Sequence, residues 1–249
     1  SSGSATSLAV TQTSPRNVGS GRLVAASAAE SSLPKMLMSE PGAVGPAKLA
    51  AFTTPAAVKF GARFVGFVTF PKSPRHISTE TMRALGARVP KSVTRVGLFV
   101  DPDDALLDEK LATGALDLLQ LHGSETPERV AAIKARTGRA VMKVIKVAAA
   151  GDVERGIAAY SSIADRLMFD AAEGTLPGGN AKVFDWTTLS GRSVPVPWML
   201  AGGLTPANVA EAVRVTHARA VDVSSGVESA RGVKSIDLIR AFLETVKAL

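Results

Sequence analysis

The stretch that decides the fold is VDVSSGVE, residues 221–228. It continues an apolar run, Ala218–Val223, that predicts a buried strand. The run stops at two hydroxyls and a glycine, Ser224–Gly226, where a tight turn exposes backbone N–H groups. A helical apolar pattern follows at 236–249. Backbone amides at such a strand-to-helix turn form a cradle for a phosphate.

A second glycine turn lies one predicted strand earlier. Gly202 and Gly203 end the apolar run Pro197–Ala201. Two neighbouring strands that end in such turns, close to the end of the chain, are typical of the phosphate site of a (βα)8 barrel. The sequence therefore predicts a phosphate site built from the last two strands of a TIM barrel.

The remainder of the chain alternates short apolar runs with helical patterns, which favours an α/β fold with a parallel sheet. Predicted helices lie at Asp103–Thr113, Thr126–Thr137, Thr205–Thr216 and Ser235–Leu249. A count near eight strands favours closure, and no G-x-G-x-x-G motif follows the first strand. We expect one parallel eight-stranded TIM barrel over residues 46–249. Its predicted strands are Lys48–Phe52, Phe64–Phe70, Val93–Val100, Leu116–Leu121, Ala140–Val144, Arg166–Asp170, Pro197–Ala201 and Ala218–Ser224.

Composition narrows the function classes. The 249 residues contain no cysteine, which excludes disulfides, thiolate metal sites and a cysteine nucleophile. The three histidines, His76, His122 and His217, lack metal-ligand spacing, and no apolar run is long enough for a membrane span. A net charge of +7 suits an anionic phosphorylated substrate, or equally a solvated basic surface. Scattered basic residues and 5% aromatics argue against nucleic-acid binding.

The first 45 residues differ from the rest. They are rich in Ser, Ala, Gly and Pro without sustained periodicity, and we expect a disordered or poorly structured N-terminal extension. The location expected for the protein is the cytoplasm. An organelle is the alternative if residues 1–35 form a transit peptide.

Seven short motifs occur in a fixed order after residue 61. The chain resembles, on these motifs together, the phosphoribosylanthranilate isomerase family of tryptophan biosynthesis. The resemblance implies an Amadori rearrangement of N-(5′-phosphoribosyl)anthranilate with no cofactor and no metal, in a monomer or homodimer. The motifs are FPKSPR at 70–75, LQLHG at 119–123, FDA at 169–171, LPGGN at 176–180, FDW at 184–186, AGGLT at 201–205 and DVSSGVE at 222–228.

The resemblance also implies roles for individual residues. Asp170 matches the general acid, and desolvation at the mouth of an apolar barrel is expected to raise its pKa. Arg75 matches the residue that holds the anthranilate carboxylate, for which a guanidinium fork is suited. Each position also has an ordinary structural explanation, such as a loop cap or a tight turn. The remaining implied positions are Gly202, Gly203, Ser225 and Gly226 for the phosphate, and His122 and Asp222 for the rest of the substrate.

The first predicted strand departs from the family pattern. Lys-Leu-Ala-Ala at 48–51 stands where the family has Lys-Ile-Cys-Gly, so Ala50 occupies the position of the general-base cysteine and cannot accept a proton. The segment Thr54–Gly61 is also shorter than expected, and Ala172 stands where the family usually has lysine. The leading hypothesis is an isomerase impaired by loss of its base. The alternative is a non-catalytic phosphate-sugar-binding barrel, and a synthase of the indole glycerol phosphate type ranks below both.

Overall fold

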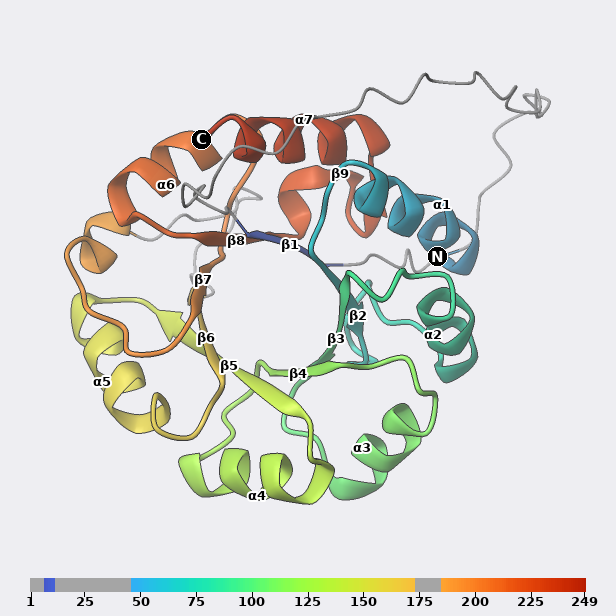
Figure 1. The fold of residues 1–249 in the computed structure, drawn as a ribbon, viewed down its shortest axis with the longest axis horizontal. Helices are drawn as coiled ribbons and strands as arrows, with labels where there is room; N and C mark the ends of the chain where they lie inside the picture. Colours follow the sequence, from blue (N-terminus) through green and yellow to red (C-terminus); the bar gives the residue numbers. More distant parts are fainter. Residues whose placement is uncertain (1–6, 12–45, 173–184) are drawn as a thin grey trace, which may run out of the picture.

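The protein, described here from a computed structural model, forms a closed barrel of eight strands with helices around it (Figure 1). The structure describes residues 7–11, 46–172 and 185–249. Strands β2 to β8 pair in sequence order and are all parallel. The strands are β1 (Ser7–Thr11), β2 (Phe64–Val68), β3 (Thr94–Phe99), β4 (Leu118–Leu121), β5 (Ala140–Val147), β6 (Arg166–Ala171), β7 (Trp198–Leu200) and β8 (Ala220–Val223).

The helices follow the strands around the outside of the barrel (Figure 1). The four predicted helices and the seven strands from β2 onward are confirmed within a few residues. The helices are α1 (Pro46–Lys59), α2 (Thr79–Gly86), α3 (Asp104–Leu111), α4 (Pro127–Thr137), α5 (Ala150–Tyr160), α6 (Val209–Thr216) and α7 (Ile236–Lys247). Shorter elements are the 3₁₀ turns η1 (Trp186–Leu189) and η2 (Ser225–Val227), and the hairpin of β9 (Glu228–Ala230) with β10 (Val233–Lys234).

Local sequence signals set the ends of the helices. In α4, the Thr126 hydroxyl accepts a hydrogen bond from the Arg129 amide, and Pro127 occupies the first turn. Gly138 ends the helix with φ 61°, the left-handed conformation that glycine adopts without strain. The same logic applies to α7, where the Ser235 hydroxyl accepts from the Leu238 amide. These caps hold each helix against its strand.

The apolar core has two layers. One fills the barrel interior and is made largely of side chains that point inward from the strands, among them Phe64, Leu118 and Met168. The other lies between the strands and the helices and includes Phe169 and Phe242, both fully buried. Because both faces of the strands are covered, their sequences are almost continuously apolar.

The first strand is where the prediction is wrong. Lys48–Phe52 lies within α1 and not in a strand. Its place in the barrel is taken by β1, Ser7–Thr11, which pairs antiparallel with both β2 and β8. The barrel is therefore not all-parallel, and five residues of the expected structureless extension belong to it. A closed sheet needs a strand between β2 and β8, and any segment with free backbone groups can supply the hydrogen bonds.

We expect the Ala9→Pro variant to open the barrel. Ala9 lies opposite Phe64 on one side and Asp222 on the other, and proline removes an amide from the ladder. The expected cost is about 2–3 kcal/mol, or about 5–10 °C in Tm. Thermal unfolding of Ala9→Pro and of the control Ala9→Val, which suits a strand, measures it. Equal Tm values in both variants would show that another segment closes the sheet. The first candidate would be Lys48–Phe52, the strand that the sequence predicts.

Candidate active site

The parallel strands surround a cavity of about 1010 Å³ at their carboxyl ends. This is the edge of the barrel where (βα)8 enzymes place their chemistry. The cavity is lined by residues from the loops that follow β2, β4, β6, β7 and β8. It brings together seven of the predicted site residues, namely Arg75, His122, Asp170, Gly202, Gly203, Asp222 and Ser225.

The two glycine turns lie against each other and against the end of β6. Gly202 has φ 86°, and a Cβ there would lie 2.4 Å from the Ala171 amide nitrogen and 3.0 Å from Asp170 Oδ1. A Cβ on Gly226 would lie 1.8 Å from the Leu204 carbonyl oxygen. Only glycine permits these close approaches. The last two parallel strands therefore end side by side, on the same rim as Asp170.

We expect the Gly226→Ala variant to disrupt this arrangement. The atoms that its Cβ would meet belong to the backbone of Leu204 and Thr205, so the turn itself must shift. The control is Gly151→Ala, whose Cβ would meet only the flexible end of Arg155. Isothermal titration with inorganic phosphate is expected to show at least tenfold weaker binding for Gly226→Ala alone. Unchanged affinity would remove this turn from the phosphate site.

Asp170 makes close contacts with the side chains of His122 and Lys146. Its Oδ2 lies 3.0 Å from His122 Nε2 and 2.6 Å from Lys146 Nζ, and Nζ lies 2.7 Å from the same His122 nitrogen. Burial acts to raise the pKa of Asp170, but the His122 hydrogen bond and the Lys146 charge outweigh it and hold the pKa below its ordinary value. The expectation of a raised pKa is therefore wrong. The resting carboxyl is ionised.

Arg75 has a partner within the protein. Its Nε and Nη2 each lie 2.7 Å from one oxygen of Glu228, a bidentate pair. Lys234 Nζ adds a contact of 3.0 Å to the same carboxylate and 2.6 Å to the Ser224 carbonyl. Burial raises the pKa of Glu228, yet the Arg75 hydrogen bond and the Lys234 charge leave it lowered. Burial also lowers the pKa of Lys234 to about 8. This network holds Arg75 at the cavity, with its Nε and Nη2 bound to Glu228.

Sequence reasoning missed several charged residues of the site. Lys146 and Arg231 line the cavity, and Glu228 fixes Arg75. The predicted fifth strand ended at Val144, whereas β5 continues to Val147. A strand drawn three residues longer would have placed Lys146 at a strand end, where the search for functional residues was made.

The remaining positions that the sequence analysis singled out have different outcomes. Ala50 lies in α1, so its placement on a barrel strand is wrong. The LPGGN motif at 176–180 and Phe184 lie outside the described residues. Ala172, which stands where the family usually has lysine, lines the cavity.

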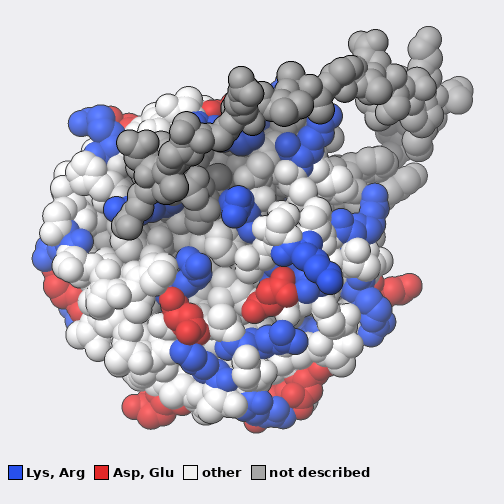
Figure 2. Space-filling model, viewed as in Figure 1, with Lys and Arg blue, Asp and Glu red and all other residues white. Residues whose placement is uncertain are grey.

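The space-filling view down the barrel shows Lys and Arg side chains interspersed with Asp and Glu over the face that is turned to the viewer (Figure 2). Over residues 7–11, 46–172 and 185–249, no three histidines or acids come together as a metal site. The helices described in the structure include none with the length and apolar character needed to cross a bilayer.

A family model described as N-(5′-phosphoribosyl)anthranilate (PRA) isomerase matches residues 49–245. A protein named N-(5′-phosphoribosyl)anthranilate isomerase from Paracoccus denitrificans is 56% identical over 196 residues, which covers 78% of this chain and 91% of that protein. The same name is carried by a relative from Paramagnetospirillum magneticum, 56% identical over 77% of this chain and 90% of its own. These names do not favour the alternative of a non-catalytic barrel.

Solved structures agree with the sequence relatives. Phosphoribosyl anthranilate isomerase from Thermotoga maritima superposes with a TM-score of 0.70 at 36% identity, covering 78% of this chain and 93% of that one. A second structure, in complex with reduced 1-(o-carboxyphenylamino)-1-deoxyribulose 5-phosphate, superposes with a TM-score of 0.66 at 34% identity, covering 78% and 92%. With this fold, this cavity and these relatives, the chain belongs to the N-(5′-phosphoribosyl)anthranilate isomerase family.

Proposed function

We propose the following roles for the site residues in the family's isomerisation, which converts N-(5′-phosphoribosyl)anthranilate to 1-(o-carboxyphenylamino)-1-deoxyribulose 5-phosphate. The observation that carries the assignment is the contact of the two glycine turns with each other and with Asp170. A phosphate seated on the turns directs the attached ribose toward the Asp170 carboxyl, which lies beside Gly202. No described residue is proposed to hold a metal or cofactor.

The two anionic ends of the substrate have separate partners. The backbone of Gly202, Gly203, Ser225 and Gly226 binds the phosphate, with the Arg231 side chain at the cavity adding positive charge. The free edge of Arg75 binds the anthranilate carboxylate, because a guanidinium already bound through Nε and Nη2 still presents Nη1. Asp222 also lines the cavity and contacts the ribose hydroxyls.

Two proton transfers complete the reaction. Asp170 delivers a proton to the ring oxygen as the furanose opens to an imine, and His122 positions that carboxyl through its 3.0 Å contact. A base then removes the proton from C2′, and the resulting enolamine tautomerises to the ketone. Ala50 marks the position where the family has its cysteine, and alanine offers no base.

We propose that the protein works as a monomer or homodimer. Localisation in the cytoplasm, or in an organelle if residues 1–35 are a transit peptide, stays a prediction.

The direct test is turnover of freshly prepared phosphoribosylanthranilate, followed by the loss of its fluorescence. Decay above a blank without protein, together with formation of the ketose product, supports the proposal. Binding of the reduced product analogue without any decay would instead leave a binding barrel. Restoring Ala50→Cys separates a missing base from a misplaced strand, because a cysteine within α1 is expected to add no activity.

A further inference from the structure

We propose that Lys146 is a catalytic residue of this chain, the proton acceptor that acts where the family's thiol is missing. The proposal rests on the proposed function and extends it to the second proton transfer. Lys146 extends from the end of β5 into the cavity, with its side chain 38% exposed to solvent. It is thus open to a substrate and in direct contact with the proposed acid.

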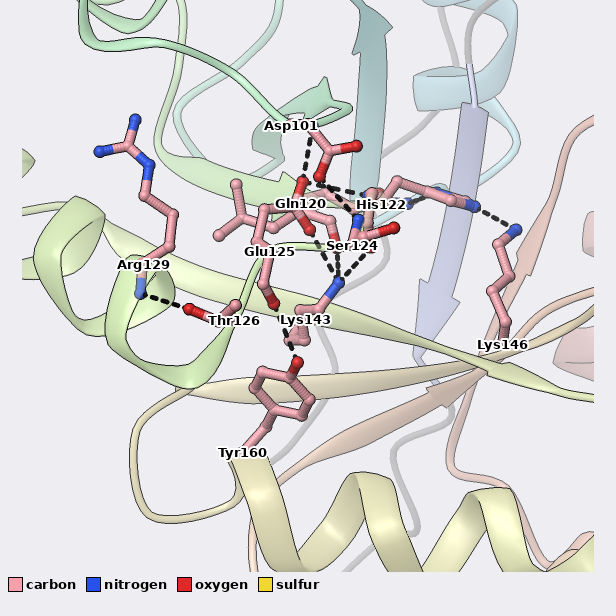
Figure 3. A network of polar contacts seen from close by, with 12 residues as sticks. Asp101, Gln120, His122, Ser124, Glu125, Thr126, Arg129, Lys143, Lys146 and Tyr160 are labelled. Atoms are coloured by element: carbon pink, nitrogen blue, oxygen red, sulfur yellow. Dashed lines mark hydrogen bonds and ion pairs between the residues drawn. The ribbon is translucent and has the colours of Figure 1, made fainter.

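The contacts of Lys146 form a triangle of three titratable atoms. Nζ is 2.6 Å from Asp170 Oδ2 and 2.7 Å from His122 Nε2, and those two atoms are 3.0 Å apart. Figure 3 shows Lys146 reaching toward His122 across the strand ends. Moving one proton along the 2.6 Å edge, from Nζ to Oδ2, converts the ammonium and carboxylate into an amine and a carboxylic acid.

The position of the His122 proton favours that transfer. The Gln120 side-chain nitrogen lies 3.1 Å from His122 Nδ1 and 3.5 Å from the Met168 sulfur, so the amide hydrogens face both acceptors. Nδ1 then accepts, and the ring proton lies on Nε2, which donates to Asp170. An ammonium at Lys146 finds no lone pair on Nε2, whereas a neutral amine has a lone pair to face that N–H group.

The proton balance closes over one turnover. Bound substrate excludes water, and a drier site favours the neutral acid and amine over two charges. The Asp170 acid protonates the ring oxygen, whose bond to C1′ breaks while the anthranilate nitrogen forms the C1′ iminium. The Lys146 amine takes the C2′ proton, and the C–H electrons form the C1′–C2′ double bond as the iminium becomes an enolamine. Carboxylate and ammonium are restored, without any other reactant.

Three substitutions test the role. Lys146→Met removes the amine, Lys146→Arg keeps a cation that does not give up its proton, and Lys146→Ala leaves room for an added amine. We expect kcat to fall by about 10²–10⁴-fold in all three, with little change in KM. Methylamine or ethylamine is expected to restore activity to Lys146→Ala in proportion to its concentration. The control Lys91→Met changes an exposed lysine outside the cavity and keeps wild-type kcat.

Two results would overturn the proposal. If Lys146→Arg keeps at least a tenth of the wild-type kcat, the residue serves only as a cation beside Asp170. If added amines leave Lys146→Ala unchanged, no amine takes part in the reaction. Binding of the reduced product analogue to each variant shows that its cavity is intact. A wild-type protein without turnover would contradict both the proposed function and the role of Lys146. A wild type that is active, and whose activity survives substitution of Lys146, would contradict the role of Lys146 alone.

Discussion

Asp170→Asn is expected to lower kcat/KM about 10³-fold while the protein remains folded. Asparagine has the shape of aspartate but supplies no carboxyl proton to the ring oxygen, and general acid catalysis is worth about 10²–10⁴-fold. The Asp170 side chain is 16% exposed and lies at the cavity, so its loss acts on bound substrate directly. Steady-state kinetics with phosphoribosylanthranilate measure the effect. The control Asp237→Asn, on an 83% exposed carboxyl of α7, is expected to match the wild type.

The same variant tests whether Asp170 and Lys146 act as one unit. Lys146 supplies the proton that Asp170 delivers, so the effects of the two substitutions are expected to be non-additive, with the double variant Asp170→Asn/Lys146→Met no slower than the slower single variant. Effects that multiply in the double variant would mean that the two groups do not exchange a proton. An Asp170→Asn protein with more than a tenth of the wild-type kcat/KM would move the acid role to another group, with Asp222 the next candidate.

Lys143→Met is expected to destabilise the protein by about 3–5 kcal/mol, because it leaves a buried carboxylate without its counter-charge. The side chains of Lys143 and Glu125 are 3% and 1% exposed, and their ion pair is 2.8 Å long. Lys143 Nζ also donates to the Gly123 carbonyl at 2.7 Å. Glu125 accepts from the backbone amides of Gly123 and Asp101. Figure 3 shows how these contacts join the loops after β3 and β4 to β5.

Thermal and urea unfolding measure this effect, which corresponds to about 6–20 °C in Tm. Lys91→Met is the matched control, since an exposed lysine contributes within about 0.5 kcal/mol. The double variant Lys143→Met/Glu125→Leu is expected to be more stable than Lys143→Met, because it removes the uncompensated charge. A single variant within 1 kcal/mol of the wild type would show that the pair does not hold the two loops.

The buried pair of Lys143 and Glu125 also helps to position His122 at the active site. His122 lies between Leu121 and Gly123, whose carbonyls both accept from Lys143. Lys143 Nζ thus fixes the backbone on either side of His122, the histidine that contacts Asp170. The resulting placement is preorganised, since it does not depend on bound substrate.

Local sequence determined the parallel strands, most of the helices and the two glycine turns. Apolar runs that end at Gly202 or Gly226 carry their own signal, because burial demands the run and close backbone approach demands the glycine. The site residues on those turns followed from the rule that loops after barrel strands carry the chemistry. The rule depends only on where each strand ends. It did not identify Lys146 because the predicted fifth strand ended at Val144, before that residue.

Tertiary structure alone decided the first strand, the charge of Asp170 and the partner of Arg75. Ser7–Thr11 closes the barrel through backbone hydrogen bonds with β2 and β8. Almost every residue type carries the same backbone groups, so the sequence does not show which segment will pair. Asp170 is ionised because Lys146, 24 residues away, and His122, 48 residues away, converge on one oxygen. Charge at a buried group is the sum of burial and neighbours, and neighbours so distant along the chain meet only when the sheet closes.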